Sequence, residues 1–214
     1  MKALPVIALD QAPEALAAAL GASFADHGFA VLDRHGLPED LVSRAWDAAR
    51  AFFAQDEAAK RVYYRPDLAG ARGYTPMRTE IAKGASAADL KEFWHIGRDL
   101  PLGSPLNDHM PANLWPAEPR AFRAIFSELF EAFDAVGLRL LSAVALHLGL
   151  PADWFTPAVA EGNSVLRLLH YPPVTGDTAR DGAISAGAHE DINLITLLLG
   201  AEESGLEILD RDGQ

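Results

Sequence analysis

The stretch Val165-Leu166-Arg167-Leu168-Leu169-His170-Tyr171-Pro172-Pro173 is the strongest local indication of the fold. Its leucine-rich run predicts a β-strand, and the two prolines end that strand because proline has no backbone N–H to donate to a sheet. Side chains alternate between the two faces of a strand, so Arg167, Leu169 and Tyr171 are expected on one face. His170 is then expected on the opposite face.

The sequence on either side of this strand predicts an α+β fold. Downstream, residues 193–199 and 206–209 are short apolar runs separated by loops, which is typical of a β-sandwich or barrel. Upstream, apolar residues repeat every three or four positions over 122–150, and this spacing predicts a long core helix. Residues 5–53 alternate between strand-like and helix-like patterns and predict the order β-α-β-α.

The segments between these elements predict loops and one extended run. Residues 64–76 and 100–119 contain many glycines and prolines, which disfavour a helix, while residues 91–96 are expected to be extended. We therefore expect residues 1–110 to form an N-terminal mixed α/β region. Residues 111–214 are expected to hold the long core helix and the first part of a β-rich core, in one continuous unit with the N-terminal region.

The composition excludes several classes of protein. The chain has 214 residues, of which 50% are apolar and 22% are charged, as in an ordinary globular protein with a full core. Its net charge of −12 disfavours binding to nucleic acid and to anionic membranes. The absence of cysteine excludes thiolate metal ligands and disulfides, and it fits a cytoplasmic location. The apolar stretch 133–150 contains charged residues, so it predicts a buried helix and not a membrane span.

His189-Glu190-Asp191 is the clearest candidate for a metal-binding motif. On an extended segment, two residues at this spacing project from the same face, so an imidazole and a carboxylate can reach one ion. Two histidines and one carboxylate bind non-haem iron on one side and leave three positions for other ligands. A lone His-x-Asp is also a common surface pair, and the glycine-rich residues 182–187 before it favour the metal site. Asn193, two residues further on, is expected either to contact a bound ligand or to stabilise a turn.

A series of short motifs runs through the chain in a consistent order. They are residues 5–10, His27-Gly28-Phe29 with Asp33-Arg34-His35-Gly36, Phe52-Phe53 with Lys60, Arg72-Gly73-Tyr74, Lys91-Glu92-Phe93, residues 113–116, residues 166–173, His189-Glu190-Asp191 and residues 205–208. In this order the motifs resemble those of the isopenicillin N synthase-like family of non-haem iron(II), 2-oxoglutarate-dependent dioxygenases. Asp33-Arg34 stands where that family usually has asparagine.

The resemblance implies a fold, a metal and a cosubstrate. The fold is a double-stranded β-helix, or jelly roll, with a helical N-terminal support, and the jelly roll is incomplete in the given chain. The family binds iron(II), here at His189 and Asp191, and it uses 2-oxoglutarate and dioxygen to hydroxylate, desaturate or cyclise a small molecule. Tyr171, Arg167 and Asn193 are then candidates for binding the cosubstrate or the substrate. The family's second iron-ligating histidine and its 2-oxoglutarate-binding arginine are expected beyond Gln214.

Two other functions remain open on the sequence. The first is an iron-dependent oxidase of the same fold that does not use 2-oxoglutarate, because the deciding residues are expected beyond Gln214. The second is a non-catalytic binding protein, since two ligands hold a metal weakly and an open sheet edge can pair with a partner. A structural or surface role is expected for the remaining histidines, His95 included. The substrate and the oligomeric state stay open.

Overall fold

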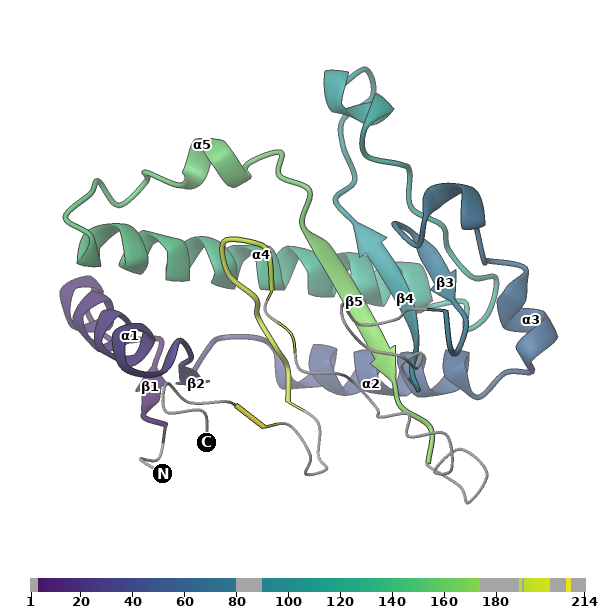
Figure 1. The fold of residues 1–214 in the computed structure, drawn as a ribbon, viewed down its shortest axis with the longest axis horizontal. Helices are drawn as coiled ribbons and strands as arrows, with labels where there is room; N and C mark the ends of the chain where they lie inside the picture. The colour runs from purple at the N-terminus through teal and green to yellow at the C-terminus, as the bar shows by residue number, and fades with distance from the viewer. Residues whose placement is uncertain (1–3, 80–89, 174–188, 190, 201–206, 209–214) are drawn as a thin grey trace. The chain divides into compact units, whose positions relative to one another are not determined.

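The computed structural model describes residues 4–79, 90–173, 189, 191–200 and 207–208 (Figure 1). Helices and strands follow in the order β1 (Val6–Ala8), α1 (Pro13–His27), β2 (Val31–Asp33), α2 (Glu39–Phe53), α3 (Glu57–Arg61), β3 (Gly73–Thr75), β4 (Glu92–Gly97), α4 (Phe122–His147), α5 (Thr156–Val159) and β5 (Val165–His170). Two short 3-10 helices, η1 (Pro66–Leu68) and η2 (Pro105–Asp108), lie in loops. The chain forms two compact units, the first made of Met1–Pro38, Glu131–Ala160 and Asn193–Gln214, and the second of Glu39–Phe130 and Glu161–Ile192.

The first unit contains a β-α-β element. β1 and β2 pair in parallel, with Val6 opposite Val31, and α1 connects them. Parallel neighbours need a long connection because a tight turn can join only antiparallel strands. α1 ends where Gly28 takes a left-handed conformation, with φ of 73°, and its N–H bonds to the Phe24 carbonyl.

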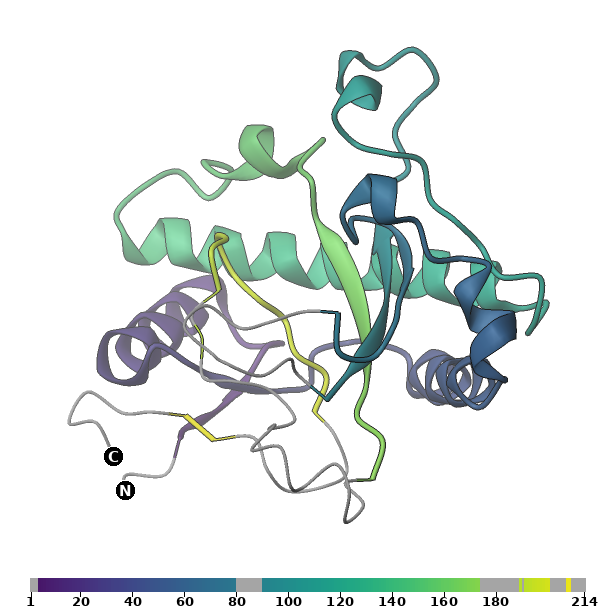
Figure 2. The same ribbon diagram turned by 45° about the vertical axis from the view of Figure 1, so that its right-hand side comes forward.

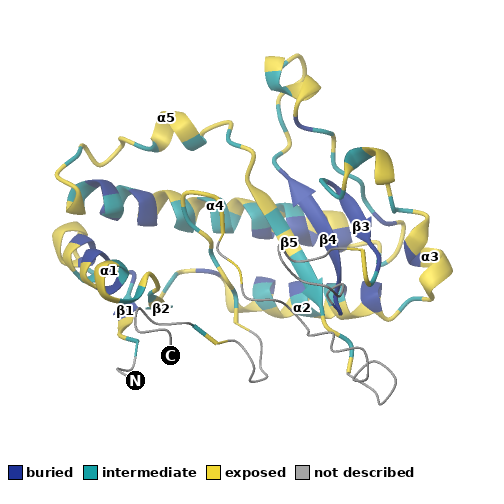
Figure 3. Ribbon diagram, in the orientation of Figure 1, coloured by how far each residue is buried: buried dark blue, intermediate teal, exposed yellow. Residues whose placement is uncertain are grey.

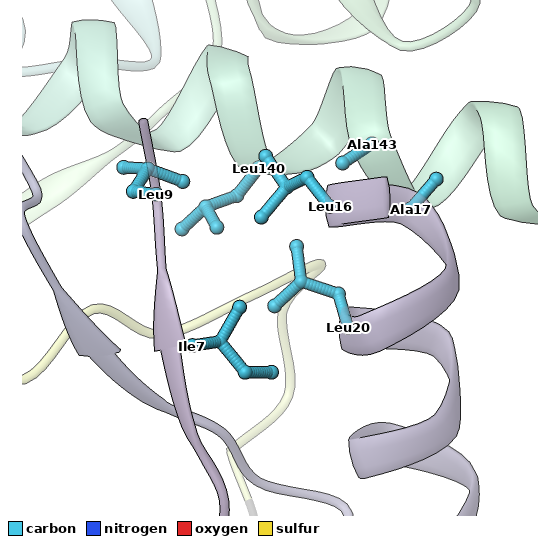
Figure 4. Packing of buried hydrophobic residues seen from close by; sticks show 7 residues of the cluster. All are labelled: Ile7, Leu9, Leu16, Ala17, Leu20, Leu140 and Ala143. Atoms are coloured by element: carbon cyan, nitrogen blue, oxygen red, sulfur yellow. The ribbon is translucent and has the colours of Figure 1, made fainter. Parts of the chain in front are cut away.

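The core of the first unit lies among α1, the chain from β1 to Leu9, and α4 (Figure 4). Ile7, Leu9, Leu16, Leu20 and Leu140 pack together there, and none is more than 4% exposed. Burying each such side chain contributes about 1.5–3 kcal/mol, so this cluster supplies a large part of the stability of the unit.

The second unit contains an antiparallel sheet of order β3-β4-β5, whose strands lie side by side in Figures 1 and 2. His95 of β4 lies opposite Gly73 on one side and opposite Arg167 on the other. Because side chains alternate along each strand, this register places Phe93, His95, Arg167 and Leu169 on one face. The opposite face carries Tyr74, Glu92, Trp94, Leu168 and His170.

Aromatic rings from α2 and from the start of α4 pack against the face that carries Trp94. The ring centroids of Phe52 and Phe122 lie 4.8 and 5.4 Å from that of Trp94, and all three residues are fully buried. β3 and β4 are buried along their whole length, whereas β5 is half-buried or exposed (Figure 3). Edge-to-face packing of this kind joins the Trp94 face of the sheet to α2 and α4. The face that carries Arg167 takes no part in these ring contacts.

The structure confirms most of the predicted elements. The α+β class, the β-α-β-α order at the start, the long helix α4 and the strands β4 and β5 all form as expected. β3 forms within residues 64–76, where the sequence predicts a loop. The strand predicted at 193–199 is wrong, because these residues form no strand. Of the strand predicted at 206–209, only 207 and 208 are described. No closed barrel forms among the described residues.

α4 behaves as a core helix and not as a membrane span. Its 26 residues include Leu140, Leu141 and Ala143, which are buried in the unit core. Within the described ranges, no helix combines the length and the apolar composition that crossing a membrane requires.

Candidate functional site

His189 and Asp191 lie close enough to share a ligand. The His189 Nε2 and the Asp191 Oδ1 are 3.5 Å apart, and their side chains are 62% and 47% exposed. Two donors at right angles on one first-row metal ion, each about 2.0–2.2 Å from it, lie about 3 Å apart. The pair is therefore near the separation that a shared ion requires, and an imidazole with a carboxylate suits iron(II).

A third protein ligand does not appear in the described part of the chain. No group of three histidine, aspartate or glutamate residues there could hold a metal ion. His170 is the nearest histidine before the motif in sequence, and it binds Glu92. Its Nδ1 lies 2.7 Å from the Glu92 Oε1, on the face of the sheet opposite Arg167. The alternation predicted for β5 is thus confirmed at His170.

Arg167 is oriented by His95, which lies directly opposite on β4. The Arg167 Nε donates to the His95 Nε2 at 2.6 Å, and the His95 Nδ1 lies 2.6 Å from the Gly70 carbonyl oxygen. Arginine can only donate and a carbonyl can only accept, so the imidazole carries its proton on Nδ1 and accepts at Nε2. The Arg167 Cζ also lies 4.8 Å from the centroid of the Phe93 ring, a cation–π distance.

The two other predicted ligand-binding residues are Tyr171 and Asn193. Tyr171 directly follows β5 and is 41% exposed. Asn193 belongs to the first unit, where its Nδ2 donates to the Thr196 Oγ1 at 2.9 Å. This bond fits the turn-stabilising role that the sequence allows for Asn193, while its contact with a ligand stays a prediction.

A buried ion pair lies on the opposite face of the sheet. The Lys60 Nζ is 2.7 Å from the Glu92 Oε2, and the two side chains are 7% and 4% exposed. The Lys60 Nζ also donates to the Phe53 carbonyl at 3.1 Å, and both Tyr74 and His170 donate to the Glu92 carboxylate. A buried carboxylate needs such partners, so this network links α3 to all three strands of the sheet.

The protonation states in this network follow from its hydrogen bonds. Burial alone would raise the pKa of Glu92, but hydrogen bonds from His170, Lys60 and Tyr74 outweigh burial and hold that pKa below its usual value. Burial, together with the hydrogen bond to Glu92, raises the pKa of Tyr74. Glu92 is therefore ionised while Tyr74 keeps its proton. Because these side chains lie on the face opposite Arg167, the network holds the sheet together and does not form part of the Arg167 site.

Arg72 is buried beside the end of β4. It is 1% exposed, and it donates from Nε to the Pro111 carbonyl at 3.0 Å and from Nη1 to the Ala71 carbonyl at 2.7 Å. Burial lowers the pKa of this arginine. A Cβ placed on Gly97 would overlap the guanidinium, so the absence of a side chain at Gly97 makes room for Arg72.

Replacing Gly97 with alanine should therefore destabilise the protein by about 1–3 kcal/mol, because the buried Arg72 guanidinium must move. Urea unfolding of the full-length protein measures this change. Gly137→Ala is the matched control, since the nearest atom to its new Cβ is the Leu197 Cδ1 at 3.8 Å. Alanine there should stabilise α4 by up to about 1 kcal/mol. Equal stability changes in the two variants would contradict the proposed packing of Arg72.

Comparisons with known proteins show the family of this chain. Residues 4–118, more than half of the chain, match the family described as the N-terminal part of a non-haem dioxygenase in morphine synthesis. The crystal structure of a 2OG-Fe(II) oxygenase family protein from Caulobacter crescentus is 49% identical, with a TM-score of 0.88 over 100% of this chain and 69% of that one. The chain belongs to the 2OG-Fe(II) oxygenase family.

Two further proteins resemble this chain. Proline hydroxylase buaE from Petromyces alliaceus is 30% identical over 213 residues, which cover 95% of this chain and 65% of the relative. A full-length Neurospora crassa protein, solved in complex with alpha-KG, is 26% identical with a TM-score of 0.71, over 88% of this chain and 61% of that protein. The chain thus spans less than two thirds of these two relatives. Solved 2OG-Fe(II) oxygenases have a jelly-roll fold, so the expected fold class is confirmed.

The contact between His95 and Arg167 is a feature of this sheet that the sequence does not predict. The sequence places His95 at the end of a short extended run and favours a structural role for it. Its contact with Arg167 depends on the register between two strands that are 72 positions apart in sequence. The pairing of these two strands is shown by the structure alone.

Proposed function

We propose that this chain forms the iron-binding and cosubstrate-binding part of an iron(II)- and 2-oxoglutarate-dependent oxygenase that oxidises a small molecule. The observation that carries the proposal is the pairing of His189 with Asp191, 3.5 Å apart, in a chain of this family. Two relatives support it, because the Neurospora crassa protein has been solved with alpha-KG and buaE is named a proline hydroxylase. Hydroxylation of a small organic molecule is therefore the reaction class that we favour.

In this proposal, the two ligands hold the metal from one side. His189 would contribute Nε2 and Asp191 a carboxylate oxygen, and the ion would bind the cosubstrate and dioxygen through its remaining positions. When bound, iron(II) with 2-oxoglutarate and dioxygen supplies the oxidising chemistry. The chain's own residues have three tasks, which are to fix the ligand geometry, to orient the substrate and to keep water away from the reacting atoms.

Residues after and within β5 are proposed to bind the organic ligands. The Tyr171 hydroxyl donates to a carboxylate of the cosubstrate or substrate, and Arg167 pairs with an anionic group. Strand alternation supports this assignment, because it directs Arg167 and Tyr171 to the same side. Asn193 is proposed to contact a bound ligand when the site is filled.

The composition of the chain supports our proposals for its class of substrate and for its location in the cell. A net charge of −12 favours a small-molecule substrate over nucleic acid and over an anionic membrane surface. The absence of cysteine fits a cytoplasmic location, where disulfides are rare.

Tyr171→Phe should raise the apparent dissociation constant for 2-oxoglutarate or for the substrate by about tenfold, while the iron content stays constant. The change removes one hydroxyl donor and keeps the ring, and a hydrogen bond to a charged group contributes about 1.5–3 kcal/mol. Calorimetric titration of the iron-loaded, full-length protein measures both constants. Unchanged constants for both ligands would mean that Tyr171 only packs against its neighbours.

Iron-dependent binding of 2-oxoglutarate tests the proposed function itself. In anaerobic titrations of the full-length protein, we expect saturable binding of 2-oxoglutarate with iron(II) present and at least about tenfold weaker binding without it. Tight iron binding with no effect on 2-oxoglutarate would contradict the proposal and favour the oxidase alternative. No binding of either would favour a non-catalytic binding protein.

A further inference from the structure

The last residue of β5, His170, is fixed by two buried neighbours. Its Nδ1 lies 2.7 Å from the Glu92 Oε1, and Glu92 is the residue opposite it in the register of β4 and β5. Its ring also stacks on that of Phe53 in α2, with the centroids 5.2 Å apart and an angle of 23° between the ring planes. Phe53 is 6% exposed and the Glu92 side chain is 4% exposed, so the end of β5 is held by groups of the core.

The Glu92 carboxylate that binds His170 is anchored by other partners. The Lys60 Nζ lies 2.7 Å from the Glu92 Oε2, and the Tyr74 hydroxyl donates to the same oxygen. An ionised carboxylate can only accept hydrogen bonds, so the His170 Nδ1 carries a proton and donates it to Glu92. His170 is thus bonded to a group that is joined to both α3 and β3.

Tyr171 follows His170 directly and has little backbone freedom of its own. It precedes Pro172, and a following proline restricts a residue to extended conformations. Pro172 and Pro173 have no backbone N–H, so they donate no hydrogen bond that could extend the pairing of β5. The last register pair before Tyr171 is that of Glu92 with His170. The direction of the Tyr171 side chain therefore depends on how firmly His170 is held.

We infer that His170 is a positioning residue, which holds the Tyr171 hydroxyl in the direction that binds a carboxylate of 2-oxoglutarate. Neighbouring side chains on an extended chain point to opposite sides, so His170 can bond to Glu92 while Tyr171 faces the ligand. His170 acts through the chain in this arrangement and does not contact the cosubstrate. The inference rests on the proposed function, because it concerns the orientation of a residue of that same site.

A double-mutant cycle in the full-length protein tests this inference. Anaerobic calorimetry gives the dissociation constant of 2-oxoglutarate, with iron(II) bound, for the wild type, His170→Phe, Tyr171→Phe and the double variant. His170→Phe keeps a ring against Phe53 and removes the donor to Glu92. We expect His170→Phe to weaken binding about fivefold and Tyr171→Phe about tenfold. Because His170 acts only through the Tyr171 hydroxyl, the double variant should bind within about twofold of Tyr171→Phe, whereas independent effects would multiply to about 50-fold.

Two further variants separate positioning from general stability. His170→Asn retains an N–H donor in place of Nδ1, since both nitrogens are bonded to Cγ, so its dissociation constant should stay within about twofold of the wild type. Tyr74→Phe is the matched control, because it removes a donor to the same carboxylate that belongs to β3 and not to β5. It should lower the melting temperature and leave the dissociation constant of 2-oxoglutarate unchanged. Should His170→Phe fail to fold, His170→Leu takes its place in the cycle.

Several results would overturn the inference. They are unchanged 2-oxoglutarate affinity in His170→Phe or in Tyr171→Phe, losses that multiply in the double variant, and a folded His170→Asn that binds as weakly as His170→Phe. An equal loss of affinity in Tyr74→Phe would also overturn it, since the effect would then belong to the whole network. Iron-dependent binding of 2-oxoglutarate by the wild type alongside any of these results removes only this inference, whereas its absence in the wild type removes the proposed function.

Discussion

Alanine at His189 or at Asp191 should weaken iron(II) binding by the full-length protein about 100-fold or more and abolish 2-oxoglutarate-dependent oxygen uptake. Changes to residues that only support metal ligands already cost about 10–100-fold in affinity, and these two are assigned as the ligands themselves. Water replaces an imidazole or a carboxylate poorly, since it contributes neither the charge of Asp191 nor the basic nitrogen of His189. Iron content after dialysis and the rate of oxygen uptake measure the two effects.

The control for this experiment is another exposed histidine. His109→Ala removes an exposed imidazole at the end of η2, far from the His-x-Asp motif in sequence, and should leave iron content and oxygen uptake unchanged. Asp191→Asn keeps the shape of the side chain and loses its charge, so it should also lose most of the iron. Wild-type iron content in both alanine variants would remove the assignment of His189 and Asp191.

Lys60→Met should destabilise the full-length protein by about 3–5 kcal/mol, the largest stability change that we expect. The substitution leaves the Glu92 carboxylate buried at 4% exposure without its cationic partner, and an uncompensated buried charge is costly. Arg61→Met is the matched control on the same helix. The Arg61–Glu57 pair is 55% and 48% exposed, so its loss should cost no more than about 0.5 kcal/mol.

A second substitution tests whether the buried charge causes the effect. Lys60→Met combined with Glu92→Gln removes both charges but keeps an acceptor for the Tyr74 hydroxyl and for His170. The double variant should recover a substantial part of the lost stability, because no buried charge is left unpaired. Urea unfolding measures all of these variants. A double variant no more stable than Lys60→Met would show that the unpaired charge of Glu92 is not the cause of the lost stability.

Long and strongly periodic elements of this fold could be predicted from the sequence. The spacing of Phe122, Phe126, Leu129 and Leu140 repeats over many turns, so the helix α4 is specified by local pattern alone. β3 could not be predicted in this way, since three residues in a glycine-rich segment give too short a pattern. The apolar run 193–199 misled in the opposite direction, because a strand needs a paired neighbour as well as apolar residues.

The residues of the candidate site likewise differ in how far the sequence alone predicts their contacts. His189 and Asp191 are two residues apart, so the sequence itself indicates that they can share a ligand. The contact between Arg167 and His95 arises from strand register, which the sequence of either strand does not specify. The Lys60–Glu92 pair joins a short helix to a strand 32 positions away, and the sequence offers only the family resemblance of both segments as a hint.

The most direct test of the central claim is anomalous X-ray diffraction at the iron edge from anaerobic crystals of the full-length protein grown with iron(II). The account predicts one strong iron peak within bonding distance of the His189 Nε2 and of an Asp191 carboxylate oxygen. An iron peak bonded to other residues, with His189 and Asp191 unliganded in the same map, would contradict it.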